Sequence, residues 1–221
     1  ARAMFTMAAI TLLSLPLAWP LRRRAGDHAA DASAVDDGGL RAQLRLAVRD
    51  RSYWCLHLGF FTCGLHIAFL VTHLPGEIAL CGLSPTVAST SIALIGLFNI
   101  AGSLIVGALG QRYRMKYLLF WMYASRAVMI GVYLVAPPTP LTFYVFSAAL
   151  GFTWLATVPP TAGLVGKLFG PRYLGTLFGL TLLSHQLGGF FGPRLGGTAL
   201  PHTGPYMYVR SAALALSVLA A

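Results

Sequence analysis

Hydrophobic residues are grouped along the chain into seven long runs that are separated by short polar stretches. A helix needs about 20 apolar residues to cross the hydrocarbon core of a bilayer, and most of the runs reach about this length. The pattern therefore predicts an all-α membrane protein with seven transmembrane helices. These helices are expected over residues 3–19, 53–74, 86–109, 117–136, 142–164, 173–197 and 206–221.

The composition of the chain also points to the bilayer. Hydrophobic residues make up 57% of the 221 residues, charged residues make up 10%, and the mean hydropathy is +0.70. In soluble domains about a quarter of the residues are charged. A chain with so few charges is expected to be an integral membrane protein.

The positive charges predict which loops are cytoplasmic. The net charge of +10 would also suit a nucleic-acid-binding protein, but 12 of the 16 Lys and Arg residues lie in residues 21–52, 112–116 and 167–172. Short loops rich in Lys and Arg stay on the cytoplasmic side. We therefore expect residues 21–52 and the loops 110–116 and 165–172 to be cytoplasmic, in a plasma (inner) membrane, and we expect no nucleic-acid partner.

A long polar stretch, residues 25–50, follows the first predicted helix. Its first part is rich in Ala, Asp and Gly and is expected to be a flexible linker. Residues 40–48 carry leucines at 40, 44 and 46 among arginines at 41, 45 and 49. This pattern is typical of a short amphipathic helix. Such a helix would either lie on the inner leaflet or be solvated, and the sequence leaves both alternatives open.

Several polar residues fall near the middle of the predicted helices, where each of them needs a partner or a function. A layer of polar side chains at one depth is typical of a solute cavity. The candidate substrate-binding residues are His66, Asn99, Arg126, Trp154, Thr157, His185 and Gln186.

Arg126 is the most informative of these residues, because no carboxylate lies in any predicted span. One interpretation is a counter-charge for an anionic solute, since a guanidinium binds carboxylates well. The other is a structural arginine that bonds to backbone carbonyl groups. His66 and His73 share a helical face, and a histidine in a membrane cavity can relay protons near neutral pH.

The stretch GALGQRYRMK, residues 107–116, is a basic loop between two predicted helices. It resembles the loop signature of the major facilitator superfamily, Gly-x-Leu-x-Asp-Arg-x-Gly-Arg-Lys. In that superfamily the loop joins helices 2 and 3, and a weaker copy joins helices 8 and 9, which the departures here fit. Gly107, Leu109, Arg112 and Lys116 match the signature, Gln111 replaces its Asp, and Arg114 replaces its second Gly.

The resemblance implies that the chain holds helices 6 to 12 of a twelve-helix transporter. Residues 1–20 would be the last helix of the N-terminal half, residues 21–52 the cytoplasmic linker between the halves, and residues 53–221 the C-terminal six-helix bundle. The chain starts without Met inside an apolar run, so we expect a piece of a longer protein. Residues 60–197 are most similar to the bacterial monocarboxylate and oxalate/formate branch of the superfamily.

A glycine motif in the sixth predicted helix, Gly-x3-Gly-Pro-x2-Gly-Gly, resembles the antiporter signature of the superfamily. Glycines at this spacing let two helices approach closely. We expect the motif to form a packing and gating face together with the basic loop, and the antiporter interpretation stays open. These residues are Gly188, Gly192, Pro193, Gly196 and Gly197 of the motif and Gly107, Gln111, Arg112, Arg114 and Lys116 of the loop.

The resemblance and the polar layer together predict a secondary active transporter that moves a small organic solute by alternating access. A monocarboxylate-type anion is the leading solute class, and a proton-coupled exporter (antiporter) of amphipathic compounds is the alternative. The expected partners are the lipid bilayer, the solute, protons and the N-terminal half of the same transporter. The chain has no Gly-x-Ser-x-Gly, His-Glu-x-x-His or Walker motif, so we expect no enzyme activity, no cofactor and no metal.

Overall fold

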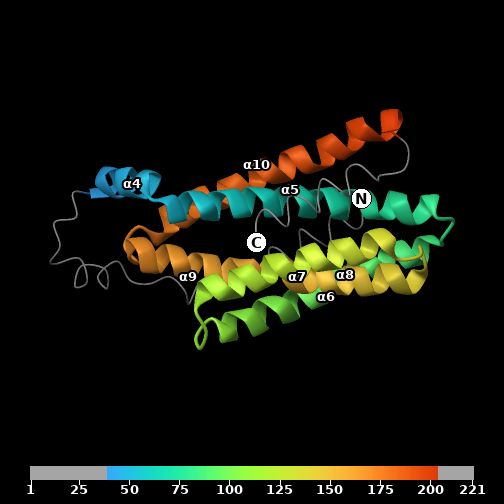
Figure 1. Ribbon diagram of the computed structural model, residues 1–221, viewed down its shortest axis with the longest axis horizontal. Helices are drawn as coiled ribbons and strands as arrows, with labels where there is room; N and C mark the ends of the chain where they lie inside the picture. The colour runs from blue at the N-terminus through green and yellow to red at the C-terminus, as the bar shows by residue number, and fades with distance from the viewer. Residues whose placement is uncertain (1–38, 204–221) are drawn as a thin grey trace, which may run out of the picture. The chain divides into compact units, whose positions relative to one another are not determined.

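The computed structural model describes residues 39–203, and in this range the ordered elements are helices (Figure 1). The helices predicted over residues 3–19 and 206–221 lie outside the described residues. The elements are α4 (Gly39–Arg49), α5 (Arg51–Leu80), α6 (Pro85–Leu109), α7 (Met115–Val135), α8 (Pro140–Trp154), the 3-10 turn η2 (Leu155–Thr157), α9 (Val158–Phe169) and α10 (Leu174–Thr203).

Four stretches of the described chain are long and apolar enough to cross a membrane. These are α5, α6, α7 and the combined stretch Pro140–Phe169, which contains α8, η2 and α9. The four stretches correspond to the second to fifth predicted helices. The sixth predicted helix is α10, which has 30 residues but is not among these four.

The loop that we expected over residues 75–85 is much shorter, because α5 continues through Pro75 to Leu80. A proline inside a helix removes one hydrogen bond. Leu74 and Ile78, on either side of it, are 2% and 1% exposed in the hydrophobic core. Tertiary packing therefore outweighs the local preference for a break, and only residues 81–84 connect α5 to α6.

Two other predicted loops are also shorter. The expected cytoplasmic loop 165–172 is helical as far as Phe169, where α9 ends. The next residue is Gly170, whose φ of +79° suits glycine. The expected outer loop 198–205 is helical as far as Thr203.

The spanning helix Pro140–Phe169 is broken inside the span. The sequence predicts this break at Pro159 and Pro160, and the structure places it slightly earlier, at the 3-10 turn η2. Both prolines lie in the first turn of α9, where their missing N–H groups are tolerated. The carbonyl groups one turn before them have no helical donors, so the chain tightens there into the 3-10 turn.

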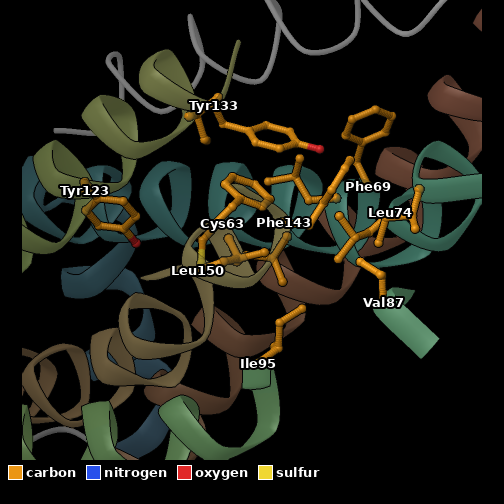
Figure 2. Close-up of a cluster of buried hydrophobic side chains, with 14 of the residues drawn as sticks. Cys63, Phe69, Leu74, Val87, Ile95, Tyr123, Tyr133, Phe143 and Leu150 are labelled. Carbon is orange, nitrogen blue, oxygen red and sulfur yellow. The ribbon is translucent and has the colours of Figure 1, made fainter. Parts of the chain in front are cut away.

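Side chains from α5, α6, α7 and α8 converge in one hydrophobic core (Figure 2). Tyr133 of α7 stacks on Phe146 of α8 with ring centroids 3.9 Å apart. Lipid tails are as apolar as leucine, so in a bilayer such contacts stabilise the helix pairs through van der Waals packing. The residues labelled in the figure are Cys63, Phe69, Leu74, Val87, Ile95, Tyr123, Tyr133, Phe143 and Leu150.

The short helix α4 is attached to the bundle by its apolar side. Ala47 is fully buried against Tyr53 of α5, Val165 of α9 and Leu177 of α10. The three arginines of α4, at positions 41, 45 and 49, are exposed. The helix predicted over residues 40–48 is therefore confirmed, and its leucine stripe faces protein in part, since Leu44 packs against the same cluster.

Helices pack closely at two places through glycine. Figure 1 shows α5 and α10 running side by side, and α6 packs extensively against α8. At Gly64, Gly188 and Gly192 an added Cβ would overlap a carbonyl oxygen of the facing helix. At Gly102 and Gly151 the same overlap would occur between α6 and α8. These positions need glycine because backbone meets backbone there.

Candidate functional site

Arg126 of α7 lies in the interior between α5, α7 and α8, with no exposed surface. Its Nε donates to Thr153 Oγ1 at 3.3 Å, and one terminal nitrogen donates to the Thr153 carbonyl oxygen. The other terminal nitrogen donates to Cys63 Sγ at 3.0 Å and to His66 Nε2 at 3.1 Å. The guanidinium also lies 5.7 Å from the centre of the Tyr123 ring. Protein groups therefore surround the cation on every side.

Among the residues that the structure describes, no carboxylate bonds to Arg126 to balance its charge. Glu77 is the one acidic residue that follows Asp50 in the sequence. It lies 11 residues beyond His66 on the same helix, which is roughly 16 Å at 1.5 Å per residue. Figure 2 labels Tyr123 of this cluster at the left edge of the core and Cys63 closer to its middle. Thr153 lies in the last turn of α8, so the carbonyl end of that helix contributes partial negative charge beside the guanidinium.

The broken helix carries two of the candidate residues, Trp154 and Thr157, and the hydrogen-bond partner of a third, Asn99. Asn99 of α6 is half-buried, and its Oδ1 accepts a hydrogen bond of 2.9 Å from the backbone N–H of Leu155. Trp154 is half-buried, and among the described residues its Nε1 has no hydrogen-bond partner. Thr157 is buried and bonds to the carbonyl of Trp154. The break thus gathers polar groups from α6 and α7 around one turn.

His185 and Gln186 of α10 lie next to the same interior. His185 is half-buried, with its ring 6.0 Å from that of Phe60, and Gln186 is exposed. The two side chains contact each other, with His185 Nδ1 3.2 Å from Gln186 Oε1. His185 also passes close to α5, because its carbonyl oxygen faces Gly64.

The expected packing and gating residues fall into two groups. On α10, Gly188, Gly192 and Gly196 meet α5, whereas Gly197 has open space around it and Pro193 accepts a bond of 3.2 Å from His73. In the basic loop, Gln111, Arg112 and Arg114 are exposed, Lys116 lies 5.0 Å from the Tyr117 ring, and Gly107 faces Pro159 of α9.

Three contacting residues were not among the candidate substrate-binding residues. In the sequence Cys63 looks like a small apolar core residue, yet its sulfur accepts a hydrogen bond from Arg126. Thr153 lies near the middle of the fifth predicted helix, and the structure shows that it accepts two hydrogen bonds from Arg126. His57 bonds to Ser184 Oγ at 2.5 Å and thereby joins α5 to α10. None of these pairs is close in sequence, so no local spacing signals them.

A cavity of about 500 Å³ lies between α5, α7 and α9. Leucine and phenylalanine side chains line most of it. Lys116 and Thr161 add polar groups, and so does Tyr123, whose buried hydroxyl has no partner among the described residues. None of the hydrogen-bond partners of Arg126 lines this cavity.

A helical bundle with several apolar spanning helices and a polar cluster in its interior defines a multi-pass membrane protein. The chain belongs to the Major Facilitator Superfamily, because residues 1–193 match the sequence profile of that family. The membership suggested by the basic loop is thus confirmed.

Two curated relatives of the chain are named as MFS-type transporters. The uncharacterized MFS-type transporter YcxA of Bacillus subtilis (strain 168) is 24% identical over 159 residues, which cover 70% of this chain and 38% of the relative. The uncharacterized MFS-type transporter YhjX of Escherichia coli (strain K12) is 25% identical over 146 residues, which cover 64% and 36%. The chain therefore spans well under half the length of these relatives.

Proposed function

We propose that the full-length protein is a secondary active transporter that moves a small organic solute by alternating access. The observation that carries the proposal is the break of a spanning helix beside the buried cluster of Arg126. Transporters build solute sites at discontinuous helices whose free polar ends point inward. In this proposal residues 1–20 end the N-terminal half, residues 21–52 link the halves, and residues 53–221 form the C-terminal bundle that works with the N-terminal half.

A monocarboxylate-type anion is the solute class that the charges favour. Arg126 places a fixed positive charge inside the bundle, and the sequence supplies no acidic residue after Glu77. Arg126, His66 and Thr157 are enclosed, so their effect on a solute would act through the electric field and the helix positions. The residues that a solute can reach are the half-buried or exposed ones, Asn99, Trp154, His185 and Gln186. The resemblance to the monocarboxylate and oxalate/formate branch supports the same class.

The second candidate is a proton-coupled exporter of amphipathic compounds. The exposed side of α10 favours it, because Leu183, Leu187 and Phe190 surround Gln186 and are 54%, 51% and 62% exposed. Such a surface would accommodate an apolar body, with His185 and Gln186 binding a polar group. A gradient of protons would supply the energy in either case.

Uptake by the full-length protein in proteoliposomes tests the proposed function. With an imposed pH gradient, we expect saturable accumulation of radiolabelled short monocarboxylates and none of a lipophilic cation. Accumulation of the cation alone would select the exporter. No gradient-driven flux of either class would contradict the monocarboxylate proposal.

The proposed orientation places the basic loop in the cytoplasm and the α5–α6 turn outside. We expect a cysteine at Tyr113→Cys, in a background with Cys55→Ser and Cys81→Ser, to react with a membrane-impermeant maleimide only from the cytoplasmic side. The exposed Cys81 should react only from the outer side, as should Thr139→Cys. The reverse pattern of labelling would invert the topology.

A further inference from the structure

The break between α8 and α9 leaves part of the backbone without its usual helical partner. In η2 the N–H of Val158 bonds to the carbonyl of Leu155, three residues earlier, and the other bonds of a 3-10 turn have the same spacing. The N–H of Thr157 is therefore directed to Trp154 and not to Thr153. Inside a bilayer no water is present to satisfy a released carbonyl group, so another donor has to reach it.

Arg126 supplies that donor to Thr153. One terminal nitrogen of the guanidinium bonds to the released carbonyl oxygen, and Nε bonds to the hydroxyl of the same residue. The planar fork of arginine suits two acceptors that are held side by side. The cation also sits at the carbonyl end of α8, where the helix dipole favours positive charge. The break and the buried arginine thus stabilise each other.

Cys63 and His66 hold the opposite edge of the guanidinium. Both lie on α5, one turn apart, and both are at most 1% exposed. Arg126 consequently joins α5 to the end of α8 through α7. Asn99 reaches the break from α6 and accepts from the N–H of Leu155. Side chains from two neighbouring helices therefore fix the two residues that flank Trp154.

We propose that Arg126 is a positioning residue that caps α8 at its break and holds η2 as the hinge between α8 and α9, with Asn99 as its counterpart on α6. The capping follows from the contacts alone. The role of the hinge in moving α9 between two arrangements rests on the proposed function.

A double-mutant cycle on the full-length protein tests the capping. In the native background, Arg126→Met is expected to lower the unfolding temperature by roughly 5 °C, because the Thr153 carbonyl loses its donor. Pro159→Ala together with Pro160→Ala restores two backbone N–H groups and allows one continuous helix. In that background Arg126→Met is expected to shift the unfolding temperature by less than half as much. Ser125→Ala, on the exposed side of α7, is the matched control and should have no effect in either background.

Equal losses in both backgrounds would overturn the capping role. If the variant without the two prolines does not fold, Arg126→Lys decides the question in the native background. Lysine keeps the cation at the end of α8 and one donor, so the proposal expects at least half of the thermal stability lost in Arg126→Met to return. Equal unfolding temperatures for the Lys and Met variants would overturn it.

Transport kinetics test the hinge. For Arg126→Lys in proteoliposomes, we expect the maximal rate to fall at least fivefold and the half-saturating solute concentration to stay within twofold. A changed half-saturation at an unchanged maximal rate would place Arg126 at the solute and overturn the positioning role. If the native protein moves no solute while the thermal cycle shows coupling, the proposed function fails and the capping stands.

Discussion

Replacing Gly188 with alanine is expected to prevent most of the protein from folding. The added Cβ would overlap the carbonyl oxygen of Phe61 on α5, and neither backbone can move aside without separating α5 from α10. Overpacking of this kind destabilises by at least about 3 kcal/mol, against a total of about 5–15 kcal/mol for a typical domain. The measurement is the yield of monodisperse protein after detergent extraction, which should fall several-fold. Gly102→Ala, which would meet the carbonyl of Phe152 on α8, should behave in the same way.

Gly96→Ala and Gly197→Ala are the matched controls. Both glycines lie in the same helices as the close-packed ones, and in the described part of the chain no atom of another helix lies within 4 Å of an added Cβ. Alanine favours a helix over glycine by about 0.5–1 kcal/mol in soluble proteins, so these variants should be as stable as the parent or more so. Normal yields for Gly188→Ala would show that the two helices do not meet at this distance.

Arg126→Leu is expected to weaken the apparent affinity for a carboxylate solute at least about tenfold, measured as half-saturation of uptake per folded molecule. A unit charge about 10 Å away contributes about 1.7 kcal/mol at an effective dielectric of about 20, a factor of more than ten. Arg126→Lys keeps the charge and should retain the parent affinity, although its maximal rate falls.

A neutral solute provides the control for this prediction. The maximal rate of its uptake should change but the half-saturating concentration should not, because the electric field of Arg126 changes the binding energy of charged solutes only. If Arg126→Leu leaves the half-saturation for the carboxylate unchanged, the charge plays no part in selecting the solute, and the exporter becomes the better candidate.

The sequence predicts helices well where local signals and burial agree. The starts of α6 and α7 follow from Pro85 and from the basic loop, and the structure places both within two residues of the prediction. The predicted end of α5 at residue 74 was wrong. Pro75 is a strong local signal for a break, whereas the burial of Ile78, which keeps α5 helical, is a tertiary effect. The helix break was expected one turn late, since the prolines act on carbonyl groups that precede them.

The site was harder to predict, because its contacts join distant parts of the chain. The sequence identifies Arg126 as an unusual residue, and the cost of a charge in a bilayer makes it conspicuous. Its partners Cys63, His66 and Thr153 lie 63, 60 and 27 residues away. Which way each side chain points depends on the rotation of three helices about their axes, and the flat hydrophobic pattern of a membrane helix does not reveal this. The candidate residues were chosen by their depth in the predicted helices, so they include both enclosed and accessible side chains.

The burial of Ala47 against Val165 has a mechanical consequence. Val165 belongs to α9, which follows the helix break, and Ala47 belongs to α4, which precedes α5. Both side chains are fully buried in one cluster, so a movement of α9 relative to α4 would separate packed side chains unless α4 moved with it. We therefore expect α4, which leads into α5, to be coupled to α9, the part of the broken helix that follows η2. Cutting the chain at α4 or restraining α4 would then change how easily α9 moves.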